Sequence, residues 1–424
     1  MERIQERVTR ELLGAGADHA AVRWTESEKQ ELNVEWDEVS LLRTTRDRSL
    51  QLVALVGGRR ATVGCNDTTD EALQRSVAAT IEAARGSNPD EANAIAEASG
   101  PRSFESGATS ADLDAMHDRL VEFLEWRRTE HPRVNLRGVN FHFQRTHTAL
   151  SNSNGVDLSS SVGGYTFVAV FSSRQGADVS SFNYSVWEGR SLDRPLAEVG
   201  SFDRLFRQSA DQLQTQGVPE KFVGDVILTP DSLPSFLEPA TSYLRDGALI
   251  SGTSVYQDRL GEQITAPVIT LHSAPLSMAS PRFFTEDGFV AEDSTLIDRG
   301  VLCSYLLSLY GANKTGLTRA VNDGGSHKVA AGDVALQDMI ASVERGVLLC
   351  RFSGGRPSGN GDLSGIAKNS YYIENGRLSF PLSETMVSGN LVAALAQAAA
   401  VSRERVDFGW GHYPWVQLRG LTIS

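Results

Sequence analysis

The first side chains in this sequence that could support catalysis are its histidines, because imidazoles are common ligands of a catalytic zinc ion. There are eight: His19, His117, His131, His142, His147, His272, His327 and His412. None lies in a His-Glu-x-x-His or His-Glu-x-x-x-His sequence, in which two imidazoles lie on adjacent helical turns. His142 and His147 are five positions apart in a strand-like run, and an odd spacing puts them on opposite faces of a strand. We therefore expect no shared metal site there.

Two other arrangements could support catalysis. Ser364 and Lys368 are four positions apart, which on a helix would allow a serine–lysine nucleophile pair. This stretch leads into a predicted strand, so an independent hydrolase is only an alternative. His412 lies among Trp410, Tyr413 and Trp415, and such an aromatic cluster either lines a groove or, as we favour, packs in a core or interface.

The sequence lacks the signature motifs of two other enzyme classes. No Gly-x-Ser-x-Gly elbow indicates an α/β-hydrolase, and no Gly-x-x-x-x-Gly-Lys loop indicates nucleotide hydrolysis. Cys303 lies in an apolar segment, so we expect a buried structural thiol rather than a nucleophile. With Cys65 and Cys350 it makes three widely spaced cysteines, which suggests neither a disulfide framework nor a clustered zinc site.

A dense group of glycines lies between residues 354 and 365. Glycine permits positive φ and the close approach of another backbone. An extended peptide could add to a strand edge here through main-chain hydrogen bonds. Tight turns between short strands also explain the glycines and are the interpretation we favour slightly, although both can hold. The candidate peptide-binding residues are Gly354, Gly355, Asn360, Gly361 and Asp362.

Hydrophobic periodicity indicates the elements that would position these groups. Apolar residues at helical spacing predict helices at 2–14, 68–86, about 110–129 and about 195–214. Strands are predicted at 20–24, 31–36, 39–45, 50–56 and 61–64, with a hairpin turn at Gly57-Gly58. Residues 87–109 are predicted to be a long connector, and strands follow from 133 to 188. After Thr229, Asp231 is a plausible helix cap and Pro234 lies in the first turns.

Composition limits the class of protein. The 424 residues are too many for one ordinary core, and a change in composition near residue 220 predicts domains at 1–219 and 220–424. Acidic residues outnumber basic ones by 53 to 40, and this net charge of −13 argues against direct nucleic-acid binding, because an anionic surface repels phosphate. The longest apolar run near the end, 391–401, is too short to span a bilayer, and residues 1–7 show no secretory signal. We expect no membrane association and a cytoplasmic location.

The order of several motifs resembles the TldD/PmbA family, long labelled modulators of DNA gyrase and understood as metallopeptidase subunits. The resemblance covers most of the chain and is strongest after residue 220. The motifs lie at 285–288, 296–302, 346–350, 354–355, 360–365, 372–376, 388–391 and 418–424. It implies a two-domain α+β fold, with an N-terminal α+β domain and a C-terminal domain rich in antiparallel sheet.

The same resemblance implies a degenerate metal site. Catalytic members carry His-Glu-x-x-x-His on a helix, with a cysteine near the C terminus. The matching positions after Thr229 are Glu238, Pro239 and Tyr243, and no cysteine follows Cys350. Proline cannot act as a base, and a phenol is a rare zinc ligand. We therefore expect no metal and no catalytic residue in this chain.

The family resemblance thus predicts the non-catalytic TldE/PmbA-like branch, inactive by itself. Its expected partner is a TldD-like catalytic subunit that supplies zinc, in a heterodimer that degrades or processes unfolded and small peptides. The alternative is a homodimeric peptide-binding or scaffold protein that has no catalytic partner.

Overall fold

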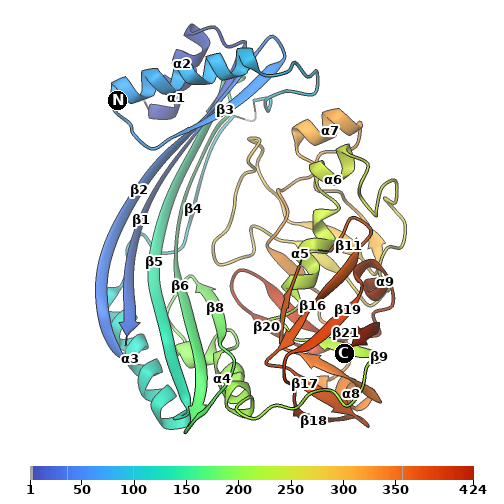
Figure 1. Cartoon of the computed structure of the whole chain (residues 1–424). Helices are drawn as coiled ribbons and strands as arrows, with labels where there is room; N and C mark the ends of the chain where they lie inside the picture. Colours follow the sequence, from blue (N-terminus) through green and yellow to red (C-terminus); the bar gives the residue numbers. More distant parts are fainter. Residues whose placement is uncertain (1–2, 36, 99, 356) are drawn as a thin grey trace.

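The computed structural model describes residues 3–35, 37–98, 100–355 and 357–424, which form two β-sheets with helices packed on them (Figure 1). The last strand of the first sheet ends at Gly189, and the first strand of the second begins at Phe222. The α+β fold class predicted from the sequence is confirmed. The division at 219/220 stays a prediction.

The first sheet is an elongated, curved layer whose strand order is β3-β2-β1-β5-β6-β4, with β7 and β8 also paired to β6 (Figure 1). All pairs are antiparallel except β4 with β6. The strands are β1 (His19–Glu35), β2 (Glu38–Val56), β3 (Arg59–Cys65), β4 (Pro101–Ser106), β5 (Val134–Asn152), β6 (Asp157–Gln175), β7 (Asp178–Val179) and β8 (Asn183–Gly189).

The long strands differ from the sequence prediction. The segments 20–24 and 31–36 belong to one strand, β1, and 39–45 and 50–56 belong to β2; residue 36 lies outside the described residues. The middle of each strand is charged, which hides the apolar alternation. Glu28 pairs with Arg46 at 2.7 Å and Glu26 with Arg48 at 2.7 Å, so opposite charges face each other across the two strands. The predicted connector 87–109 likewise contains a strand, β4.

Helices cover one face of this sheet near both of its ends. The helices are α1 (Ile4–Gly14), α2 (Asp70–Gly86), α3 (Leu113–Glu130), the 3-10 turn η1 (Leu196–Glu198) and α4 (Phe202–Asp211). Val22 and Leu52 pack against α1 and α2 in one core, whereas Phe141 and Phe167 pack against α3 and α4 in another. The predictions 68–86 and 110–129 are confirmed. The helix predicted at 2–14 is α1, which begins at Ile4; residue 2 lies outside the described residues. The helix predicted at 195–214 is interrupted between η1 and α4.

The second sheet has the main strand order β12-β11-β10-β13-β21-β9-β14-β17-β18, with β19 and β20 paired to β21, and β16 between β15 and β19. Among the named strand pairs in the described part of the chain, β9–β14 and β13–β21 are parallel and the others antiparallel. The strands are β9 (Phe222–Leu228), β10 (Leu271–Ser273), β11 (Ser294–Asp298), β12 (Val301–Leu302), β13 (His327–Val329), β14 (Arg345–Leu349), β15 (Arg351–Gly354), β16 (Asp362–Lys368), β17 (Tyr371–Glu374), β18 (Arg377–Pro381), β19 (Thr385–Asn390), β20 (Ala400–Asp407) and β21 (His412–Ile423).

Short helices accompany this sheet: α5 (Pro234–Ser242), α6 (Asp246–Ile250), α7 (Leu309–Thr315), α8 (Leu336–Ala341) and α9 (Leu391–Ala396). Asn390 caps α9 by accepting a hydrogen bond from the Ala393 amide at 3.0 Å, as expected for a helix that opens at a Gly-Asn pair. The tight turn between β17 and β18 uses Asn375 and Gly376, both at positive φ. Among the described residues, no helix is long and apolar enough to cross a membrane.

Cys303 is exposed, so the prediction of a buried thiol is wrong. Leu302, the last residue of β12, is fully buried, and the chain leaves the strand directly after it. The thiol therefore lies outside the core although its neighbours in the sequence are apolar.

Candidate functional site

The degenerate metal-site positions lie on α5, directly after the buried strand β9. Pro234 begins the helix, as predicted, because its fixed φ suits a first turn. Asp231 does not cap it: residue Leu233 occupies the N-cap, and the Asp231 carboxylate instead pairs with Arg204 of α4. The cap prediction is therefore wrong, because an ion pair to another element holds that carboxylate.

The three degenerate positions have different surroundings. The Glu238 side chain is exposed, and Pro239 lies inside the helix and is partly exposed. Tyr243, immediately after the helix, is 8% exposed and contacts the ring of Tyr256 edge-on, with the ring centres 6.1 Å apart. Its hydroxyl donates a hydrogen bond to the Ser358 carbonyl at 2.7 Å. Tyr243 is thus a core side chain.

These residues do not fit a zinc ion. Zinc in proteins takes histidine, cysteine and carboxylate ligands, usually four in total with any water. Of the three positions only Glu238 offers such a group, and it faces solvent. Within the described ranges, no three His, Cys, Asp or Glu side chains lie close enough together to hold a metal ion.

The fold places Tyr243 against part of the predicted peptide-binding segment. Residues 358–362 form a turn in which the Gly361 amide donates to the Ser358 carbonyl and Gly361 has φ +92°. The Asn390 side chain donates to the Asn360 carbonyl at 2.9 Å and to the Asp362 carboxylate at 3.0 Å. Hydrogen bonds from Asn390 and Asn360 lower the pKa of Asp362 below its usual value. The polar groups of this turn are therefore largely engaged with one another.

Gly354 and Gly355 lie at the other end of the glycine-rich segment. Gly354 ends β15, which in the described part of the chain pairs only with β16 and so has one open edge. A Cβ atom on Gly354 would lie 2.8 Å from the Ser364 carbonyl oxygen, so the closely approaching backbone requires glycine there. Binding of a peptide at this edge stays a prediction.

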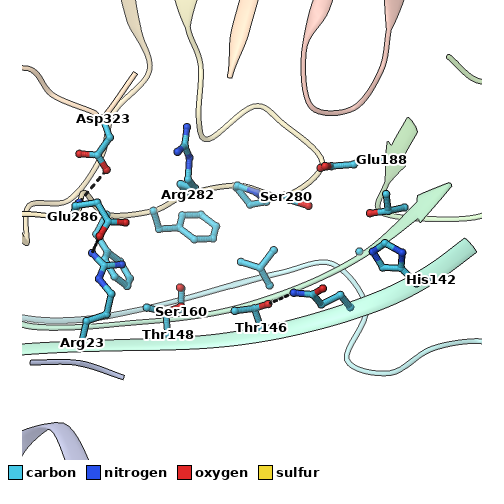
Figure 2. Close-up of a pocket in the computed structure, with 17 residues that line it drawn as sticks. Arg23, His142, Thr146, Thr148, Ser160, Glu188, Ser280, Arg282, Glu286 and Asp323 are labelled. Atoms are coloured by element: carbon cyan, nitrogen blue, oxygen red, sulfur yellow. Dashed lines mark hydrogen bonds and ion pairs between the residues drawn. The ribbon is translucent and has the colours of Figure 1, made fainter. Parts of the chain in front are cut away.

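A separate recess lies between the first sheet and the second half of the chain. We call it the interdomain groove: a cavity of about 500 Å³ between the β5–β6 face and residues 280–286 (Figure 2). Its floor carries Gln144, Thr146, Thr148 and Ser160, and Ser280 lies on the opposite wall. A cavity of this size is typical of ligand-binding sites. Its lining of hydroxyl and amide groups can form hydrogen bonds along its length.

The two ends of the groove carry different charged groups: Arg23, Glu286 and Asp323 lie at one end, and Glu188 lies at the other. Arg23 of β1 lies at one end, where it donates to the Thr285 carbonyl at 2.9 Å and approaches Glu286 at 3.5 Å (Figure 2). Its Nε is buried and has no hydrogen-bond partner among the described residues. Glu188 of β8 and His142 of β5 lie at the other end (Figure 2).

The strand register gives the length of the groove. Arg23 lies opposite residue 150 of β5, and Glu188 lies opposite residue 166 of β6, which in turn faces His142. The two charged ends are therefore eight residues apart along β5, or roughly 27 Å at ~3.4 Å per residue. This length matches a short extended peptide segment.

The ionisation of the Glu188 carboxyl should have a measurable effect on the stability of the protein. Burial raises the pKa of its carboxyl above the usual value, and a hydrogen bond with Ser280 opposes this only in part. Among the described residues no cation pairs with it. Because the folded state holds this proton more tightly than the unfolded state, ionised Glu188 lowers stability as pH rises from its unfolded pKa through its folded pKa.

We expect Glu188→Gln to be more stable than the parent protein at neutral pH, because it removes a half-buried negative charge. The difference should vanish below the unfolded pKa of glutamate, where Glu188 is protonated in both states. Urea unfolding followed between pH 4 and pH 8 measures it. Exposed Glu97→Gln is the control, and an equal pH dependence in Glu188→Gln and the parent would contradict the assignment.

The other sequence candidates are separated by the fold. His142 lines the interdomain groove, whereas His147 lines a pocket on the opposite face of the sheet, as its odd spacing predicts. Ser364 and Lys368 are both on strand β16, roughly 13 Å apart along it, so they cannot form a nucleophile pair. The Lys368 ammonium instead pairs with Glu384 at 2.9 Å.

The aromatic residues around His412 pack, as favoured above. The Trp410 and Tyr413 rings lie 5.4 Å apart at their centres, and the Arg204 guanidinium lies 4.8 Å from the ring centre of Trp415. His412 contacts the Asp407 carboxylate at 3.3 Å, and burial lowers the pKa of this histidine.

Sequence reasoning missed the interdomain groove. Its residues come from β1, β5, β6, β8, the 280–286 segment and Asp323, and no local motif joins them. One signal was available in the sequence. Gln144, Thr146 and Thr148 are spaced two positions apart, so their side chains lie on the same face of their strand. Three polar residues on one strand face indicate a surface that is turned away from an apolar core.

Comparison with known protein families shows to which family the chain belongs. Residues 221–424 match the model of the PmbA/TldA metallopeptidase C-terminal domain, and residues 20–84 match that of PmbA/TldA metallopeptidase domain 1. The chain therefore belongs to the PmbA/TldD family. The family resemblance inferred from the motifs is confirmed.

Individual relatives agree with this assignment. The chain is 23% identical over 404 residues to Metalloprotease PmbA of Escherichia coli O157:H7, covering 90% of this chain and 86% of that protein. It is 23% identical over 199 residues to a protein of Saccharolobus solfataricus named Zinc metalloprotease TldD homolog, covering 43% and 44% of the two chains.

Solved structures show the same fold. TldE from Thermococcus kodakarensis superposes with a TM-score of 0.84 at 18% identity, covering 100% of both chains. A protein of Bacteroides thetaiotaomicron named as a modulator of DNA gyrase superposes with a TM-score of 0.87 at 22% identity, covering 99% of this chain and 98% of that one.

Proposed function

We propose that this chain is the non-catalytic, TldE/PmbA-like subunit of a cytoplasmic metallopeptidase complex. A TldD-like partner supplies the zinc ion and the catalytic base, and the complex degrades or processes unfolded and small peptides. The observation that carries the proposal is the content of α5. Where catalytic members hold two imidazoles and a glutamate, this chain has solvent-facing Glu238, Pro239 and buried Tyr243.

The interdomain groove supports a role in holding the peptide. Its floor is a row of hydroxyl and amide groups, and its ends carry Arg23 and Glu188. Such groups can bind the main chain of an extended peptide without selecting its side chains. The open edge of β15 near Gly354 is a second surface at which an extended peptide could add as a strand.

The first experiment concerns the chain alone. We expect the purified protein to contain far less than one zinc per chain after dialysis against zinc, and not to cleave an unfolded peptide library. Elemental analysis and mass spectrometry of the digest measure these two properties. Stoichiometric zinc together with peptidase activity would refute the non-catalytic assignment.

The second experiment adds the partner. Co-expression with a TldD-like chain that carries His-Glu-x-x-x-His should give a mixed species on size-exclusion chromatography, and this species should cleave the same peptides. A TldD-like chain with the motif glutamate replaced by glutamine is the control, and it should assemble without activity. If no mixed species forms, the homodimeric scaffold function is favoured instead.

A further inference from the structure

The interdomain groove contains a carboxylate whose charge is not balanced within the described part of the chain. Glu188 of β8 is half-buried at one end of the groove, where its carboxylate lies beside Ser280 (Figure 2). Among the described residues no Lys, Arg or His side chain forms an ion pair with it. His142 lies at the same end, but burial lowers the pKa of its imidazole, so this side chain is neutral at pH 7. The ionised carboxylate therefore loses contact with water without gaining a positive partner, which is unfavourable.

The fold fixes the place of this carboxylate. On one side of β8, Glu188 pairs with Thr166 of β6, and on the other its amide donates to the Phe408 carbonyl at 2.8 Å. Gly409 has φ +79°, and a Cβ atom at this position would lie 1.8 Å from the Glu188 carbonyl oxygen. The close approach of the two backbones thus requires glycine. Since the backbone of Glu188 is held on both sides, its side chain remains at the groove.

The two arginines that line the groove have other partners. Arg23 approaches Glu286 at 3.5 Å, at the other end of the groove. Arg282 donates to the Gly324 carbonyl at 2.7 Å, and its side chain points away from the floor of the groove (Figure 2). With Asp323, the lining holds three carboxylates and two guanidinium groups. The groove therefore has an excess of negative charge that a positive ligand would balance.

A metal ion does not fit this end of the groove. Within the ranges that the structure describes, no three His, Cys, Asp or Glu side chains lie close enough together to hold one. Glu188 and His142 are therefore too few ligands for a zinc ion, which usually takes three or four from the protein. A positive organic group needs only the carboxylate and neutral acceptors. The hydroxyls of Ser280 and Thr166, which also line the groove, can accept hydrogen bonds.

We propose that Glu188 binds a positively charged group of the peptide, so that the interdomain groove selects extended peptides that carry a primary ammonium or guanidinium group. A primary ammonium has three donors, and the Glu188 carboxylate and the hydroxyls of Ser280 and Thr166 are acceptors at this end of the groove. Hydrogen bonds between ionised groups are roughly twice as strong as neutral ones. The inference rests on the proposed peptide-holding role and specifies its substrate class: the floor binds the main chain, and Glu188 selects charge.

Peptide binding to the full chain alone tests the proposal. Three fluorescently labelled, amidated peptides of about nine residues match the length of the groove and are otherwise built from alanine, serine and glycine. The first is N-acetylated and has lysine at its second position, the second has glutamine there instead, and the third is the glutamine peptide with a free N-terminal ammonium. Fluorescence anisotropy at pH 7.5 measures the three dissociation constants.

We expect the lysine peptide to bind about tenfold more tightly than the blocked glutamine peptide, because an ion pair replaces a neutral contact. The third peptide identifies the source of the cation: a gain equal to that of lysine shows that a terminal ammonium serves as well, and no gain assigns the site to side chains. Glu188→Gln should bind the lysine and blocked glutamine peptides equally. This loss of preference is not a folding defect, since the variant is expected to be the more stable protein.

Glu198→Gln is the matched control, because it removes one negative charge from an exposed side chain outside the groove, and it should keep the preference. A preference for lysine that persists unchanged in Glu188→Gln would show attraction by the net charge of the whole chain and would overturn the proposal. Equal binding of all three peptides to the parent protein would also overturn it, while leaving the peptide-holding role intact. Absence of binding would contradict both, whereas assembly with a TldD-like chain is measured separately.

Discussion

Tyr243→Ala is expected to destabilise the second half of the chain by about 4 kcal/mol, since replacing a buried aromatic ring by alanine leaves a cavity. The ring is 8% exposed and contacts Tyr256, and its hydroxyl holds the turn at Ser358. We also expect the turn at 358–362 to lose order with it. Urea unfolding measures the first effect, and hydrogen exchange of the Gly361 amide measures the second.

Two variants divide this effect into its parts. Tyr243→Phe keeps the ring and removes one hydrogen bond, so we expect a loss of only about 1 kcal/mol. Glu238→Ala changes an exposed side chain on the same helix and should alter stability by less than about 0.5 kcal/mol. If Tyr243→Ala unfolds at the same urea concentration as the parent protein, Tyr243 is not the core residue described here.

The second large effect is acid sensitivity caused by His327 of β13. This histidine is 4% exposed, and its burial lowers its pKa from 6.5 to about 4. Nearby Arg245 and Arg282 add to the shift. Because the folded state binds this proton less readily than the unfolded state, stability is lost as pH falls from 6.5 to 4. The shift corresponds to about 3 kcal/mol once the pH is below the folded pKa.

A variant comparison isolates this contribution. His327→Gln removes the titrating group, so the fall in its unfolding free energy between pH 6.5 and pH 4 should be about 3 kcal/mol smaller than in the parent protein. The other titrating groups are common to both proteins and cancel in the difference. His117→Gln is the control because its side chain is 57% exposed. An unchanged pH dependence in His327→Gln would show that His327 is not buried as a neutral group.

Local patterns predicted the elements that have strong local causes. The helices at α2 and α3 show apolar residues at helical spacing, and capping side chains at Thr69 and Asp112 accept amide hydrogen bonds at their starts. The hairpin at Gly57-Gly58 follows from the backbone freedom of glycine. In each case the stabilising interaction lies within a few residues of the signal.

Features with distant causes were not predictable in this way. The middle of β1 and β2 is held by ion pairs such as Glu28 with Arg46, which are 18 positions apart. The prediction that Asp231 caps a helix was wrong because its carboxylate pairs with Arg204 of α4. The local sequence does not show that contact. The interdomain groove likewise needs Arg23, Glu188 and Ser280 to be brought together by the whole fold.

The hydroxyl-lined floor of the interdomain groove has a consequence for the direction of a bound chain. Each threonine or serine hydroxyl can rotate to donate or to accept a hydrogen bond, so Thr146, Thr148 and Ser160 would serve a peptide lying in either polarity. The ends of the groove do not impose a direction either, because both carry carboxylates: Glu286 and Asp323 lie beside Arg23 at one end, and Glu188 lies at the other. A bound peptide would therefore enter facing either way.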